Sequence, residues 1–163
     1  ALYVTLADKG FFPESDLETL CKYNSHYIGH PTKKVKGVEQ NTGALGHGLP
    51  ICVGTALSAT LDNKNFRVFT LLGDGELPEG SNWEAALAAS HYKLDNLCAI
   101  IDHNKLQITG PTLQVCNTDP IDKKFESFGL SKCFSTRIAL PVVVLCDSPL
   151  VLMMYFLSHV IFI

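Results

Sequence analysis

Two short apolar runs, separated by a segment with helical signals, dominate the middle of the chain. The runs 67–72 (RVFTLL) and 97–101 (LCAII) are almost continuously apolar, which is typical of strands covered on both faces. Between them, residues 81–84 (SNWE) form a capping-box pattern that predicts a helix running to His91. Because a strand–helix–strand unit favours parallel pairing, we predict an α/β fold, a parallel sheet with helices on both faces.

Two further helices are predicted before the first strand. Apolar residues recur at helical spacing within 49–61, and this pattern predicts a buried helix. A second capping-box pattern at 15–18 (SDLE) predicts a short helix that reaches about Tyr23. A polar loop through Lys36 and a glycine-rich stretch at 42–48 connect the two.

The C-terminal segment 138–163 (IALPVVVLCDSPLVLMMYFLSHVIFI) is far more apolar than the rest of the chain. A membrane-spanning helix needs roughly 20 consecutive apolar residues, and Pro141, Asp147 and Pro149 interrupt this run. Three interpretations stay open. The segment is a tail that is out of family or frame-shifted near residue 130; or a buried strand with a capping helix; or a membrane anchor, which we expect least.

Composition narrows the class of function. A chain of 163 residues with 47% hydrophobic residues can bury the core of one ordinary domain. Its net charge of −3 and the lack of a basic stripe argue against a nucleic-acid partner. The six cysteines include no CxxC pair, which excludes a zinc ribbon and a thioredoxin-type dithiol. Dispersed thiols and the lack of a signal-peptide pattern lead us to expect a cytoplasmic protein.

Polar residues follow each predicted strand directly. Asp74 lies in a Gly-Asp-Gly triplet after 67–72, and Asn104 follows 97–101. Since the carboxyl ends of parallel strands meet at one edge of the sheet, we expect these side chains to lie side by side. Carboxylate and amide oxygens are ligands that Mg²⁺ favours, usually together with phosphates and water. The alternative is that Gly-Asp-Gly is only a turn.

These blocks resemble the transketolase family, and most closely the N-terminal section that forms a separate chain in split transketolases. The matching text lies at 29–59, which begins GHPTKKVKGVEQNTGALGHG, and at 67–112, which begins RVFTLLGDGELPEG. The resemblance covers about residues 1–129. It implies a thiamine-diphosphate-binding fold that is incomplete here, with 1–130 as a partial diphosphate-binding domain and 131–163 as a divergent hydrophobic tail.

The resemblance also implies the cofactors and their ligands. Thiamine diphosphate would bind together with Mg²⁺, or with Ca²⁺ or Mn²⁺ in its place. Asp74, Asn104 and the backbone carbonyl of Leu106 would hold the cation, and Gly75 would contact the diphosphate through its N–H. Gly43 and Leu45 would touch the aminopyrimidine end through backbone groups.

Three residues match catalytic positions of the family. His30 would face the reacting carbon and bind hydroxyls of a ketose donor, and Glu79 and Glu84 would link two cofactor sites across a dimer interface. Each has a simpler interpretation: a loop histidine is usually only solvated, and Glu84 fits the capping box equally well. His103 replaces the first Asn of the family's usual Asn-Asn ending.

The implied reaction is transfer of a two-carbon ketol unit from a ketose phosphate to an aldose phosphate. Nothing in the chain matches the pyrimidine-binding domain, which carries the activating Glu of the family. We therefore expect a pyrimidine-domain (C-terminal) partner chain, sugar phosphates as substrates, a homodimer or heterotetramer, and no turnover by this chain alone. The alternatives are another thiamine-diphosphate enzyme, of the deoxyxylulose-phosphate synthase or dehydrogenase E1 type, and a non-catalytic truncated interaction module.

Overall fold

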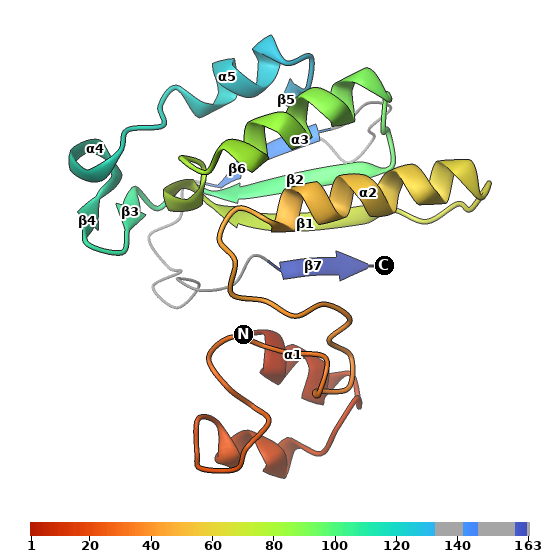
Figure 1. Ribbon diagram of the computed structural model, residues 1–163, viewed down its shortest axis with the longest axis vertical. Helices are drawn as coiled ribbons and strands as arrows, with labels where there is room; N and C mark the ends of the chain where they lie inside the picture. The colour runs from red at the N-terminus through yellow and green to blue at the C-terminus, as the bar shows by residue number, and fades with distance from the viewer. Residues whose placement is uncertain (133–141, 147–158, 163) are drawn as a thin grey trace. The chain divides into compact units, whose positions relative to one another are not determined.

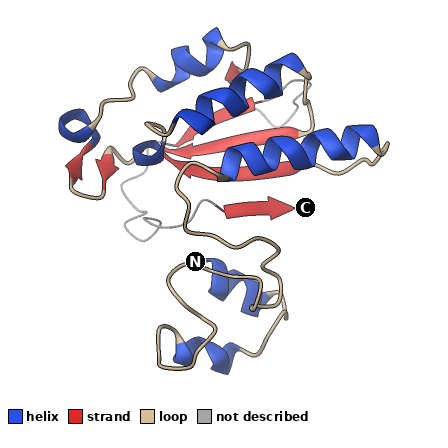
Figure 2. Cartoon of the chain, in the orientation of Figure 1, coloured by secondary structure: helices blue, strands red, loops and turns tan. Residues whose placement is uncertain are grey.

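The computed structural model describes residues 1–132, 142–146 and 159–162. Contacts divide the chain into two compact units, residues 1–44 and residues 45–163. Figure 1 traces the elements along the chain, and Figure 2 separates helices, strands and loops by colour.

Unit 1 consists of two short helices and a long irregular loop. Helix α1 spans Leu2–Asp8, and a 3₁₀ helix, η1, spans Glu14–Thr19. The predicted helix to Tyr23 is therefore wrong in type and length, and no side chain caps η1. The N-cap residue of η1 is Pro13, whose side chain has no hydrogen-bonding atom. Asp16, inside this segment, accepts a hydrogen bond of 2.8 Å from the Tyr27 hydroxyl.

The sheet of unit 2 is built around the predicted parallel pair. Strand β1 (Val68–Gly73) pairs with β2 (Leu97–Asp102), in a register that runs from Val68 opposite Leu97 to Gly73 opposite Asp102. Burial alternates along β1 but is nearly continuous along β2. We predicted that both strands are buried on both faces. This holds for β2, whereas one face of β1 is only partly buried.

Three further strands complete the order β5-β6-β2-β1-β7. Strands β5 (Ser131–Lys132) and β6 (Val142–Cys146) are parallel to their neighbours, whereas β7 (His159–Phe162) is antiparallel to β1. The antiparallel edge strand was not predicted. Of the C-terminal segment predicted as a tail, only the backbone of these strands is described, and the predicted capping helix lies outside the described residues.

Helices α2 (Gly48–Leu61) and α3 (Gly80–His91) lie side by side, and α2 packs on β1 and β2 (Figure 1). Several of the buried residues of these two helices are small: Cys52 and Ala56 in α2, and Ala85, Ala86 and Ala89 in α3. Small side chains let two helices approach closely. The predicted α/β architecture is confirmed, in partial form. Among residues 1–132 and the two later strands, no helix has the length and apolarity of a membrane-spanning segment.

The remaining described elements of unit 2 follow β1 or β2 in the chain. A 3₁₀ turn, η2 (Asp74–Glu76), follows β1, and the hairpin of β3 (Leu106–Gln107) and β4 (Gly110–Pro111) follows β2. Helices α4 (Thr112–Val115) and α5 (Ile121–Ser127) come next. In α5, Phe125 packs against Trp83 of α3, with 5.0 Å between ring centroids.

Candidate functional site

The carboxyl ends of β1 and β2 meet, and a direct hydrogen bond joins the loops that follow them. Gly73 lies opposite Asp102 in the sheet register. The backbone N–H of Lys105 donates to Asp74 Oδ2 at 2.9 Å. Two segments 31 residues apart in sequence are thereby fixed against each other. The parallel topology places these polar residues at one edge, as the sequence argument required.

The Asp74 carboxylate is deeply buried and only partly satisfied. It is 1% exposed, and its Oδ1 atom accepts no hydrogen bond from any residue that the structure describes. Burial raises the pKa of Asp74, while the Lys105 N–H and the neighbouring His103 act in the opposite direction. A buried carboxylate oxygen without a partner is costly. A bound cation would remove that cost.

Asn104 is held in one orientation beside this carboxylate. Its Nδ2 donates to Asp102 Oδ2 at 3.0 Å, and its Oδ1 accepts the N–H of Leu106 at 2.9 Å. Because an amide oxygen has two acceptor positions, Asn104 Oδ1 retains one for a further partner. The other oxygen of Asp102, Oδ1, is buried without a hydrogen-bond partner among the described residues. The sequence analysis assigned no role to Asp102.

Gly75 and the carbonyl of Leu106 approach each other closely. A Cβ atom on Gly75 would lie 2.5 Å from Leu106 O and 3.1 Å from the Cα of Gln107. Both neighbours belong to the backbone, so they cannot move aside as a flexible side chain would. Glycine is therefore required here for steric reasons. The close approach places the Leu106 carbonyl and the Gly75 backbone in one small cradle.

The oxygen atoms of this cation cradle, formed by Asp74, Gly75, Asn104 and Leu106, suit a hard divalent ion. They comprise a carboxylate, an amide oxygen and a backbone carbonyl, and Asp74 supplies the orphaned oxygen. Such ligands are the ones that Mg²⁺, Ca²⁺ and Mn²⁺ prefer. Within the described ranges, no group of three or more His, Cys, Asp or Glu side chains could hold a metal. A cation here would thus depend on added ligands such as phosphate oxygens and water.

His103, which had no assigned role, lies beside the cradle. Its Nε2 is 3.2 Å from Asp119 Oδ1 and 3.8 Å from Asp74 Oδ2, and its side chain is 14% exposed. The imidazole therefore lies between an outer carboxylate and the buried one. The chain carries an imidazole where the family resemblance implies an amide.

The start of α3 is fixed by a contact that the capping-box prediction missed. Ser81 Oγ donates to the carbonyl of Gly46 at 2.8 Å instead of capping the helix, and the N-cap residue Glu79 makes no side-chain cap. A Cβ on Gly46 would overlap the Cβ of Glu79, and the φ of Gly46 is +78°. Glu79 and Glu84 are both exposed.

The other predicted residues lie before α2. Leu45 is 40% exposed and begins unit 2. In unit 1, Gly43 lies against His30, whose Cγ would be 3.3 Å from a Cβ on Gly43. Thr42 holds these two loops together, because its N–H and its hydroxyl both donate to Pro31 O, at 3.0 and 2.8 Å. The structure thus groups His30 with Gly43 in unit 1, and Asp74, Gly75, Asn104 and Leu106 in unit 2.

A second buried carboxylate, Glu76, lies two residues after Asp74 and was not predicted. It is 6% exposed, and its Oε1 has no partner among the described residues. Burial raises the pKa of Glu76 to about 7, with a smaller contribution from the charge of Glu79. Its backbone carbonyl accepts a hydrogen bond of 2.8 Å from Asn82 Nδ2. The sequence signal was weak, since acidic residues near a turn are normally exposed.

The pH dependence of stability should reveal this buried glutamate. Because the folded-state pKa of Glu76 is raised from 4.5 to about 7, the folded chain holds the proton more tightly than the unfolded chain. Its contribution to stability is complete below pH 4.5 and is lost as the pH rises through 7. The free energy of unfolding should therefore fall between pH 4.5 and 7, and we expect Glu76→Gln to remove about 3 kcal/mol of that decrease. Urea unfolding at several pH values, with a chelator present, measures it.

Glu126→Gln is the matched control for this measurement, because Glu126 is exposed. In this variant the free energy of unfolding should change with pH as it does in the unmodified chain. The same pH dependence in the Glu76→Gln chain would contradict the raised pKa of Glu76.

Comparisons with known proteins match most of the chain. The family model described as the transketolase thiamine diphosphate binding domain matches residues 1–135. An apulose-4-phosphate transketolase subunit of Actinobacillus succinogenes is 54% identical over 129 residues, covering 78% of this chain and 47% of that protein. The transketolase of Homo sapiens is 44% identical over 129 residues, covering 78% of this chain and 21% of that protein.

Solved structures give the same picture. The transketolase of Campylobacter jejuni superposes with a TM-score of 0.73 at 27% identity, covering 80% of this chain and 24% of that one. The chain therefore spans about half the length of the apulose-4-phosphate transketolase subunits that it matches, and about a fifth to a quarter of the longer transketolases.

Proposed function

Because this chain belongs to the transketolase family, we propose that it supplies the diphosphate- and cation-binding part of a thiamine-diphosphate-dependent transketolase. The reaction is transfer of a two-carbon ketol unit from a ketose phosphate to an aldose phosphate. One feature inside the family match supports the proposal: Asp74 and Asn104 follow the carboxyl ends of β1 and β2, and the hydrogen bond from Lys105 N–H to Asp74 joins their loops.

Asp74, Asn104 and Leu106 would hold a divalent cation, which neutralises the diphosphate. The Lys105 N–H binds one oxygen of Asp74, and this leaves the orphaned oxygen to the cation. The backbone N–H of Gly75 would contact the diphosphate, where no side chain obstructs the approach. Thiamine diphosphate, when bound, supplies the electron sink for breaking and forming carbon–carbon bonds. Mg²⁺ is the expected ion, and Ca²⁺ or Mn²⁺ would suit the same oxygens.

The remaining residues would bind and orient the other parts of cofactor and substrate. His30 would position hydroxyls of the ketose donor, and its contact with Gly43 supports a shared role for this loop. Gly43 and Leu45 would touch the aminopyrimidine end through their backbones. Glu79 and Glu84 would link two cofactor sites across a dimer interface. Both are exposed in this chain, which such a role requires before the dimer forms.

A second chain is part of the proposal. This chain spans about half the length of two relatives that are named as transketolase subunits. Their names support the proposal that a complementary chain supplies the pyrimidine domain with the activating Glu. The assembly would be a homodimer of the whole enzyme or a heterotetramer of split chains. The substrates would be sugar phosphates, the class in the names of these relatives, and the location would be cytoplasmic.

Cofactor binding should depend on Asp74. We expect calorimetry with thiamine diphosphate and Mg²⁺ to show saturable binding, and Asp74→Asn to weaken it by at least about tenfold, because the anionic ligand of the cation is lost. The matched control is Asp95→Asn: Asp95 is exposed and precedes β2 at the opposite end of the strand. Equal affinities in the two variants would contradict the cation site. No binding by the unmodified chain would favour the non-catalytic interaction module.

Turnover should require the second chain. We expect no ketol transfer from this chain alone, and transfer from a ketose phosphate to an aldose phosphate once a pyrimidine-domain transketolase chain is added. The partner chain by itself is the control and should also be inactive. Robust activity of the isolated chain in a coupled assay would refute the proposed division of labour.

A further inference from the structure

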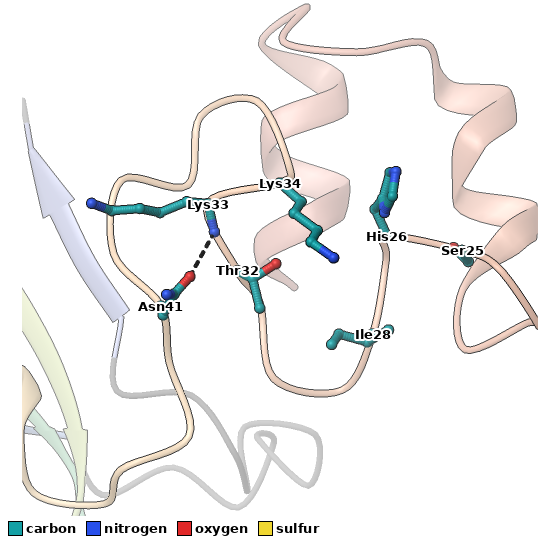
Figure 3. Close-up of a pocket in the computed structure, with 7 residues that line it drawn as sticks. All are labelled: Ser25, His26, Ile28, Thr32, Lys33, Lys34 and Asn41. Carbon is teal, nitrogen blue, oxygen red and sulfur yellow. Dashed lines mark hydrogen bonds between the residues drawn. The ribbon is translucent and has the colours of Figure 1, made fainter.

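Unit 1 contains a pocket of about 450 Å³ that none of the assigned residues lines. It lies in the loop between η1 and α2, and Figure 3 shows its lining side chains. They are Ser25, His26, Ile28, Thr32, Lys33, Lys34 and Asn41. The volume lies in the range of small-molecule sites in proteins.

The pocket is lined by hydrogen-bond donors and positive charge, and by no carboxylate. Three lysines fall within residues 33–36, although the whole chain has a net charge of −3. In the part of the chain that the structure describes, neither the Lys33 nor the Lys34 ammonium forms an ion pair or hydrogen bond. The positive charge of this loop is thus not neutralised within the described chain, and it would favour an anion.

Two polar side chains of the pocket, Thr32 and Asn41, have hydrogen-bond donors that bind no described residue. The Thr32 hydroxyl oxygen is buried and makes no hydrogen bond to any described residue. Asn41 Oδ1 accepts the backbone N–H of Lys33 at 3.0 Å, which orients the amide and leaves its Nδ2 as a donor. In Figure 3 the Thr32 hydroxyl and the end of Lys34 point toward the side where His26 lies, whereas the Lys33 side chain leads away.

We propose that this pocket binds the phosphate group of a small phosphate monoester. A phosphate dianion offers acceptor oxygens in several directions, and Lys34 and Thr32 supply donors on the side where His26 lies. The volume exceeds that of a phosphate group alone, so an attached sugar would fit, with Ile28 as an apolar wall. A polyanion such as nucleic acid is disfavoured by the negative net charge of the chain.

This site goes beyond the proposed function, because it shares no residue with the cation cradle. Its test therefore needs neither thiamine diphosphate nor a divalent cation. Calorimetry on the full chain uses three probes, inorganic phosphate, ribose 5-phosphate and ribose, at constant low ionic strength. Failure of this test leaves the cofactor-binding test unaffected.

We expect inorganic phosphate and ribose 5-phosphate to bind, and ribose not to bind. Lys34→Gln should weaken phosphate binding by about tenfold, since it removes a charge-assisted hydrogen bond. Thr32→Val, which keeps the side-chain shape, should weaken it several-fold. Lys36→Gln is the matched control: it removes the same charge from an exposed residue that does not line the pocket, and it should leave the affinity within about twofold. Circular dichroism verifies that each variant is folded.

The probes also distinguish the source of the phosphate. Tighter binding of ribose 5-phosphate than of inorganic phosphate would identify a sugar phosphate as the ligand, and equal binding would identify the free ion. Both results support the site. Absence of saturable phosphate binding, an unchanged affinity in Lys34→Gln, or binding of ribose as tight as that of ribose 5-phosphate would overturn it.

Discussion

The parallel pairing of β1 with β2 determines where the polar residues of unit 2 meet. The register places Gly73 opposite Asp102, so both chains leave the sheet at the same edge. The hydrogen bond from Lys105 N–H to Asp74 Oδ2 then joins the two loops. Every oxygen of the cation cradle comes from a residue within a few positions of this bond. An antiparallel pair of the same strands would have placed Asp74 and Asn104 at opposite edges.

Buried oxygens without partners are the clearest trace of a ligand in this structure. Asp74 Oδ1, Asp102 Oδ1 and Glu76 Oε1 all lie near the end of β1 or β2, and none has a hydrogen-bond partner among the described residues. Burial of such groups without a partner opposes folding. A cation bound at this edge would supply a partner for Asp74 Oδ1. In the absence of ligands, the same burial raises the pKa values of Asp74 and Glu76.

The sequence predicted the elements that are defined by long apolar runs, and it failed where a single side chain had two possible partners. The helix 49–61 and the two central strands follow directly from apolar patterning and are confirmed. Neither capping box forms a cap, because η1 begins after Pro13, which has no side-chain acceptor, and Ser81 donates to the carbonyl of Gly46, distant in sequence. The meeting of Asp74 with the Asn104 loop could be predicted from topology alone. The burial of Asp102 and Glu76 could not, since it depends on how η2 and the β3–β4 hairpin cover the strand ends.

The central claim is that the carboxyl ends of β1 and β2 together hold one divalent cation. Paramagnetic NMR with Mn²⁺ on the isotope-labelled chain tests it most directly, because broadening falls steeply with distance from the ion. The account predicts that the amide signals of Gly75, Lys105 and Leu106 broaden first, while those of Val68 and Leu97, at the other ends of the same strands, persist. Earlier broadening of Val68 and Leu97, or uniform broadening across the chain, would contradict the account.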